Sequence, residues 1–205
     1  SLMDIDALAW HASSDNSYDG SSYWCGDEEV GGYLDSWVQY LDTPSFTVPP
    51  GGTMSADMRW TIESPAGAVI AGTCVDGWDQ ANVQISTDAG ATWTVIDGSD
   101  PYDFDCGYGT VYNGYDGAPG WGGDEEWHNV SFDLSAYAGQ SASLRFAFYS
   151  DPAYSTIDDA GITGFQVDNI VVDGAFSDTA DDPDALSVSG EVWVDQLYDY
   201  ADETQ

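Results

Sequence analysis

The chain has 205 residues, with 37 acidic side chains against two arginines, and its formal net charge at pH 7 is -35. Such a charge excludes nucleic acid as a partner because phosphates would be repelled, and it equally disfavours anionic membrane surfaces. No stretch approaches the roughly 18–20 apolar residues of a membrane helix, so we expect no membrane insertion. Hydrophobic residues make up 42% of the chain, which is too many for a disordered protein. We therefore expect one sizeable core, and the short apolar runs between frequent glycines favour an all-β fold.

The N-terminal part predicts two strands separated by a loop. Residues 4–10 alternate partly between apolar and polar side chains, which predicts a first strand. Residues 11–35 are rich in Ser, Gly, Asp and Tyr, which predicts a loop. Residues 37–48 predict a strand that Pro44 interrupts, because proline cannot donate a ladder hydrogen bond.

Residues 54–63 and 78–95 carry the clearest strand patterns. In the first, apolar side chains alternate with polar ones until Glu63 closes the strand. In the second, one alternating run is followed by Asp88-Ala89-Gly90 and then by a run that contains Trp93. Glycine tolerates the positive φ that a tight reversal requires, so the second segment predicts a β-hairpin.

Residues 97–127 form a long irregular stretch that is rich in glycine and aromatic side chains. It is longer than an ordinary connection in a compact domain. Ordered loops of this length usually carry function or an ion, or else their own aromatic side chains pack them down.

The C-terminal half predicts three strong strands. Residues 130–134 and 141–150 alternate, and the short connection between them suits one helical turn. Residues 164–172 are apolar on both faces, which is typical of a strand inside a sheet that is covered on each side. Asp168 lies in this run, where a buried carboxylate is costly unless it has partners.

These patterns favour a single β-sandwich or β-barrel with many turns over residues 1–175. Residues 176–205 begin with a run of aspartates and are expected to form an acidic linker and tail, in which one further strand is open.

Four stretches in this order resemble the MAM-like, concanavalin-type jelly-roll domains of secreted bacterial metallopeptidases of the immune inhibitor A type and of related surface proteins. The stretches are YWCGDEEVGGYLDSWVQYLDTPSF, GWDQANVQISTDAGATWTV, WHNVSFDLSAYAGQSASLRFAFYSD and GFQVDNIVV. The resemblance spans residues 20–174. It implies a two-sheet antiparallel β-sandwich, a jelly roll with long ordered loops. It also implies an accessory role beside a catalytic domain elsewhere, secretion or surface exposure, and often bound calcium, and Asp168 matches the carboxylate of the family's final strand.

The charge imbalance also predicts a metal ion. Acidic groups inside strand patterns need cationic partners or several hydrogen bonds, and two arginines cannot serve many of them. A hard divalent ion such as calcium suits oxygen-only ligands. The candidate ligands, from strand ends and loops, are Asp168, Asp79, Asp76, Glu63 and Asp27.

The chain contains three cysteines, so at least one has no partner within the chain. Cys74 and Cys106 both fall near loops of the central region and are the favoured disulfide, with Cys25–Cys106 next. Three unpaired thiols remain the alternative.

Sequence motifs for catalysis are weak. His11 and His128 are far apart and no HExxH motif is present, so no zincin site can form. A glycosidase would need two carboxylates across a cleft, but in so acidic a chain such pairs occur by chance. We expect a non-catalytic accessory or interaction domain, with any catalysis in a domain outside this chain.

The alternative function is a carbohydrate-binding module, because exposed aromatic rings beside Asp and Asn can stack on sugars and hydrogen-bond to them. The candidate residues are Trp121, Tyr112, Tyr115 and Trp24. The expected partners are therefore other domains of the parent protein, and a polysaccharide or a cell-surface protein.

Overall fold

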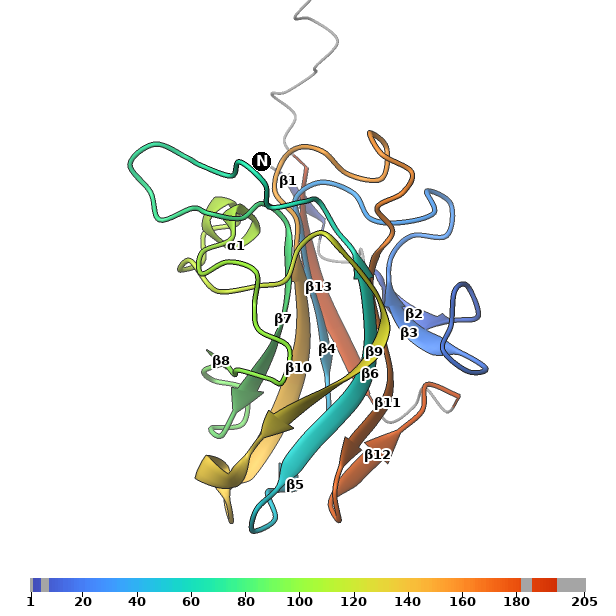
Figure 1. The fold of residues 1–205 in the computed structure, drawn as a ribbon, viewed down its shortest axis with the longest axis vertical. Coiled ribbons are helices and arrows are strands. Elements are labelled where there is room, and N and C mark those ends of the chain that lie inside the picture. Colours follow the sequence, from blue (N-terminus) through green and yellow to red (C-terminus); the bar gives the residue numbers. More distant parts are fainter. Residues whose placement is uncertain (1, 5–7, 182–185, 195–205) are drawn as a thin grey trace, which may run out of the picture.

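The protein is an all-β sandwich of two antiparallel sheets (Figure 1), seen in a computed structural model that describes residues 2–4, 8–181 and 186–194. The prediction of an all-β, two-sheet antiparallel sandwich is confirmed. Among these residues no helix is both long enough and apolar enough to cross a bilayer.

The first sheet, called sheet A, has seven strands in the order β1-β13-β4-β10-β7-β8, with β5 also paired to β10. The bounds of its strands are β1 (Leu2–Asp4), β4 (Trp37–Asp42), β5 (Phe46–Thr47), β7 (Gln80–Ser86), β8 (Thr94–Val95), β10 (Ser141–Tyr149) and β13 (Ser187–Val194).

The second sheet, called sheet B, has six strands in the order β2-β3-β11-β6-β9, with β12 also paired to β11. The bounds of its strands are β2 (Trp10–Ser13), β3 (Ser22–Cys25), β6 (Thr53–Thr61), β9 (Asp124–Asp133), β11 (Gly164–Val172) and β12 (Phe176–Asp178). Two short helical segments complete the fold, α1 (Tyr108–Tyr112) and the 3-10 turn η1 (Ser135–Tyr137).

The hydrophobic core lies between the inner faces of the two sheets. At its centre Trp60 of β6 stacks on Trp121 with ring centroids 4.9 Å apart, and both are almost fully buried. The Phe165 ring of β11 contacts the Trp60 ring edge-on and the Trp121 ring at a tilt.

β11 lies between β3 and β6, and its core residues are Phe165, Val167, Ile170 and Val172. The expectation that it is apolar on both faces is wrong, because a register shift between Asp168 and Val171 moves the core positions from odd to even residue numbers.

The hairpin of β7 and β8 is paired as predicted, with Ile85 opposite Thr94. Its turn is held by the Asp88 carboxylate, which accepts hydrogen bonds from the amide and hydroxyl of Thr92 at 2.9 and 2.6 Å. Ala89 and Gly90 have φ values of 61° and 85°, the left-handed region in which glycine is unstrained.

The single strand expected over residues 4–10 is not continuous, because Asp4 ends β1 and Trp10 begins β2. β1 and β2 flank this segment, residues 8 and 9 are not in a strand, and residues 5–7 lie outside the described residues. The loop expected over residues 11–35 instead contains most of β2 and all of β3. β2 and β3 are short and contain serines, so their sequences do not show a clear strand pattern. All four residues of β3 are nevertheless buried, and β3 pairs with β2 on one side and with β11 on the other.

Residues 97–127 are largely irregular, as predicted, and include α1 and the start of β9. Residue Trp121 of this segment exchanges backbone hydrogen bonds with Ala81 of β7 at 3.1 and 2.9 Å. Together with the burial of the Trp121 ring, these bonds tie the loop to the sandwich.

The sandwich extends beyond residue 175, the boundary expected from the sequence. Strands β12 and β13 both lie in the segment expected to be a linker and tail, and β13 pairs with β4 along six residue pairs. Val188 and Val192 of β13 alternate with polar residues, and this strand-like segment pairs with the edge of β4.

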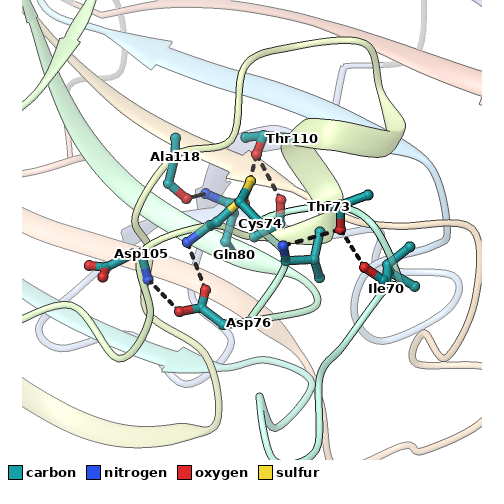
Figure 2. Close-up of a disulfide and its surroundings, with 11 residues drawn as sticks. Ile70, Thr73, Cys74, Asp76, Gln80, Asp105, Thr110 and Ala118 are labelled. Atoms are coloured by element: carbon teal, nitrogen blue, oxygen red, sulfur yellow. Dashed lines mark hydrogen bonds between the residues drawn. A yellow bond between two sulfur atoms is a disulfide. The ribbon is translucent and has the colours of Figure 1, made fainter.

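A disulfide joins Cys74, in the loop before β7, to Cys106, just before α1 (Figure 2). Beside it, the Asp76 carboxylate accepts a hydrogen bond from the backbone amide of Cys106 at 2.8 Å. Cys25 is free and buried. The disulfide therefore connects the long irregular segment to the loop that precedes β7.

We predict that Trp60→Ala lowers the free energy of unfolding by about 3–5 kcal/mol, because it leaves a large cavity beside Trp121. Urea denaturation followed by tryptophan fluorescence measures the change. Val69→Ala is the control, since Val69 is 70% exposed and its truncation should leave the midpoint unchanged. A Trp60→Ala midpoint equal to wild type would contradict the packing described here.

We also predict that the double variant Cys74→Ser/Cys106→Ser loses about 3–4 kcal/mol of stability, because the crosslink closes a loop with a sequence separation of 32. Equilibrium denaturation measures the loss. Dithiothreitol should lower the wild-type midpoint but leave that of the double variant unaltered. Equal sensitivity of the two proteins to reductant would show that the disulfide does not form.

Candidate metal centre

Three acidic side chains meet at one end of the sandwich. Glu63, Asp79 and Asp151 each offer a carboxylate oxygen, and these oxygens all lie within 4.8 Å of one another. We call these three residues the carboxylate cluster.

Strand pairing explains why the three carboxylates meet. Asp79 directly precedes β7 and Asp151 follows β10 by two positions, and the first residue of β7 pairs with the last residue of β10. Glu63 follows β6 in the other sheet. The cluster therefore joins the ends of strands from both sheets.

Asp79 is held rigidly at the centre of the carboxylate cluster and is fully buried. One of its carboxylate oxygens accepts the backbone amide of Asp151 at 2.7 Å, and the other accepts the Tyr33 hydroxyl at 2.7 Å. The backbone amide of Glu63 donates in turn to the oxygen of that hydroxyl at 3.1 Å. Tyr33 thus fixes the position of Asp79 relative to Glu63.

Among the described residues, two buried carboxylate oxygens have no hydrogen-bond partner: Oε2 of Glu63 and Oδ1 of Asp35. Asp35 is close enough to raise the pKa values of both Glu63 and Asp151 by charge repulsion. A buried polar atom without a partner costs free energy, and a carboxylate oxygen costs most when it is charged. These oxygens therefore have unused capacity to bind a cation.

Burial and repulsion by nearby carboxylates raise the pKa of every member of the carboxylate cluster. The pKa of Glu63 rises to about 8, mainly because of burial and then because of Asp151, Asp35 and Asp158. Burial also raises the pKa of Asp151 to about 7. The pKa of Asp79 is raised as well, first by burial and then by the charge of Asp151. Without a cation, the cluster holds protons near neutral pH.

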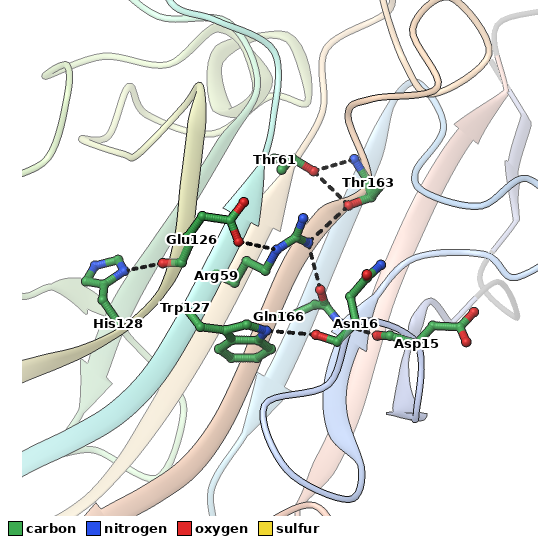
Figure 3. Close-up of polar contacts among 9 residues, drawn as sticks. All are labelled: Asp15, Asn16, Arg59, Thr61, Glu126, Trp127, His128, Thr163 and Gln166. Carbon is green, nitrogen blue, oxygen red and sulfur yellow. Dashed lines mark hydrogen bonds and ion pairs between the residues drawn. The ribbon is translucent and has the colours of Figure 1, made fainter.

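No basic side chain neutralises the carboxylate cluster, although both arginines and both histidines of the chain are among the described residues. Arg59 lies on sheet B, where it pairs with Glu126 at 3.6 Å and donates to Gln166 at 3.0 Å (Figure 3). The remaining three pair with other acids, in the contacts Arg145–Asp42, His11–Glu28 and His128–Asp100.

The structure does not bring the other predicted ligands into the carboxylate cluster. Asp168 accepts the Ser22 hydroxyl at 3.0 Å and the Asn169 amide at 2.7 Å, so its carboxylate is satisfied by neutral donors. The carboxylate of Asp76 accepts backbone amides beside the disulfide, and that of Asp27 accepts the amide of Glu29 at 2.8 Å. Each of these three carboxylates orders its own turn or strand.

The sequence prediction missed Asp151, although a signal was present. Like Glu63, it closely follows the end of a strongly alternating strand. Antiparallel pairing of that strand with β7 is what brings it to Asp79, and the sequence pattern alone does not show which strands pair.

Two of the four residues predicted to bind carbohydrate are unavailable. Trp121 is fully buried in the core, and Trp24 is buried with its indole N–H donating to the carbonyl of Thr163 at 2.7 Å. Tyr112 is half-buried beside Tyr108. Tyr115 is 40% exposed. A sugar could therefore reach Tyr115 but not the two tryptophans.

Comparison of the sequence with known proteins adds no assignment: no family model matches it, and no curated protein shows significant similarity to it.

We predict that the metal-free protein loses stability as the pH rises from about 4 to about 8. The raised pKa of Glu63 means that the folded state binds more protons than the unfolded state, whose glutamates titrate near about 4.3. The stabilisation is therefore complete below about pH 4 and is lost as the pH passes through the folded pKa. Thermal melts in EDTA at several pH values across this range measure how the melting temperature changes with pH.

Glu63→Gln should flatten this pH dependence, because glutamine has no proton to lose. The matched control is Glu125→Gln at an exposed position, which should keep the wild-type slope. If the melting temperatures of Glu63→Gln and wild type fall equally with pH, Glu63 is not a source of the pH-dependent loss of stability.

Proposed function

We propose that this chain is a calcium-stabilised, non-catalytic domain of a secreted or surface-exposed protein. The observation that carries the proposal is the carboxylate cluster: three acids with mutually close oxygens, an orphaned buried oxygen on Glu63, and no basic side chain to balance them. Charge neutrality at this site then comes from a dissolved cation.

The donor set favours calcium among the common metal ions. All the side-chain atoms available in the carboxylate cluster are carboxylate oxygens, which are hard ligands. Zinc and copper sites usually include imidazole or thiolate ligands, and neither is in the cluster. Magnesium demands near-ideal octahedral geometry, whereas calcium accepts irregular oxygen cages. Glu63, Asp79 and Asp151 would hold the ion, with Asp35 and Asp158 adding negative potential.

The role of the ion would be structural. The carboxylate cluster joins the end of β6 in sheet B to the start of β7 and the end of β10 in sheet A. An ion bound there favours the folded state, because the unfolded chain does not hold these three carboxylates together.

Burial argues against a hydrolytic use of the same acids. A glycosidase needs a carboxylate pair that reaches the substrate across an open cleft. Asp79 is fully buried, so a sugar ring has no access to its carboxylate. The carboxylate cluster therefore suits an enclosed ion better than a sugar ring.

The wider role follows from the sequence resemblance to MAM-like jelly-roll domains. We propose that the domain supports its parent protein through contacts with other domains or with a surface, and that any catalysis resides elsewhere in that protein. The two-sheet architecture is consistent with this role, but it is shared by domains of many functions.

We predict that calcium raises the melting temperature of the EDTA-treated protein. A concentration about 100-fold above Kd should add about 2.7 kcal/mol, or about 5–10 °C for a domain of this size. Differential scanning calorimetry against calcium concentration measures the shift, with magnesium at equal ionic strength as the comparison ion.

Asp79→Asn should abolish the calcium-dependent shift. Asp168→Asn is the matched control, because Asp168 is also a buried aspartate but lies outside the carboxylate cluster. Both variants can lower the starting melting temperature, so the calcium-dependent change is the quantity compared. An equal shift in wild type and Asp79→Asn would reject this site, and no shift in wild type would reject calcium binding.

A further inference from the structure

The outer face of sheet A carries a continuous row of aromatic and guanidinium groups, which we call the aromatic row. Tyr115 packs against Tyr149, and Tyr149 packs against Tyr40, with ring centroids 5.8 Å apart in both pairs. The Arg145 guanidinium lies 3.8 Å above the Tyr40 ring and 3.9 Å from the Trp93 ring, so it is sandwiched between the two.

Strand alternation places the aromatic row outside the core. On β4 and β10, Leu41, Phe146 and Phe148 point into the core, and their neighbours Tyr40 and Arg145 therefore point outward. Trp93 comes from the hairpin that precedes β8, and Tyr115 comes from the loop after α1. Several separate segments of the chain thus converge on one face.

The aromatic row is partly open to solvent. Tyr115 is exposed, and Tyr40 and Trp93 are half-buried, whereas Tyr149 is buried and supports the others from beneath. The exposed apolar surface is therefore a set of tyrosine and tryptophan rings held by neighbours rather than flexible aliphatic side chains.

Hydrogen-bonding groups accompany the rings. The amide nitrogen of Gln84 donates to the Tyr149 hydroxyl at 3.0 Å and to Oδ1 of Asn82 at 2.9 Å. The Tyr149 hydroxyl donates to the Tyr40 hydroxyl at 3.3 Å. The phenol groups are therefore pre-oriented beside the ring faces.

The aromatic row is electrically neutral in a chain with a net charge of -35. Asp42 accepts two hydrogen bonds from Arg145, both at 2.8 Å, and so cancels its charge. The rest of the chain repels polyanions, and a neutral row gives a basic partner no local attraction. The ligand chemistry that fits is a neutral molecule with apolar ring faces and hydroxyl edges.

We propose that the aromatic row binds a neutral oligosaccharide or polysaccharide chain. Pyranose faces would stack on Tyr115, Tyr40 and Trp93, while sugar hydroxyls would hydrogen-bond to the tyrosine hydroxyls and to the Arg145–Asp42 pair. This binding surface is separate from the carboxylate cluster and goes beyond the proposed calcium role.

The test is native affinity electrophoresis of the calcium-loaded protein in gels that contain laminarin, xyloglucan, galactomannan or hydroxyethyl cellulose. At least one of these neutral polysaccharides should retard wild type, and polygalacturonate, which is anionic, should not. Trp93→Ala and Tyr115→Ala should each weaken retardation by up to about tenfold in apparent affinity. Melting temperatures establish that each variant is folded.

Trp127→Ala is the matched control, because Trp127 lies on sheet B, where its indole N–H donates to the carbonyl of Asn16. It should be retarded like wild type. Absence of retardation in all four neutral gels would overturn the proposal, as would retardation of Trp93→Ala and Tyr115→Ala equal to that of wild type. Stronger retardation by polygalacturonate would also overturn it, since the ligand would then be charged.

Discussion

The placement of negative charge constrains this protein more than any other feature. The chain carries 37 acidic residues and only two arginines, so most of its carboxylates must be solvated, hydrogen-bonded or neutralised from outside. Asp168 is an example of a hydrogen-bonded carboxylate, with a hydroxyl and an amide as its donors. Glu63, Asp79 and Asp151 are different, because their carboxylates face one another and mutual repulsion adds to the cost of burial.

The carboxylate cluster lies where the ends of strands from both sheets meet. Antiparallel pairing of β7 with β10 sets Asp79 near Asp151, and the end of β6 adds Glu63 from the opposite sheet. Tyr33 connects the two sides through hydrogen bonds to both. A bound cation would complete this connection, which is why we assign the carboxylate cluster a structural role rather than a chemical one.

Both arginines are used on the outer faces of the sheets, away from the carboxylate cluster. Arg59 pairs across sheet B with Glu126 and Gln166, as Figure 3 shows. Arg145 is clamped between Tyr40 and Trp93 and neutralised by Asp42. Because both arginines pair on the outer faces, neither neutralises the carboxylate cluster, and the surface around Arg145 is neutral and aromatic.

The sequence by itself determined the all-β class, most of the long strands and the β7–β8 hairpin, because periodicity is a local property, and its charge imbalance led to the prediction of a bound cation. It could not show that Asp151 joins Glu63 and Asp79, or that Trp121 is a core residue while Trp93 lies over Arg145. Those facts depend on which strands pair and in which register. Only the tertiary structure decided them, since contacts between distant segments follow from packing of the two sheets rather than from any local pattern.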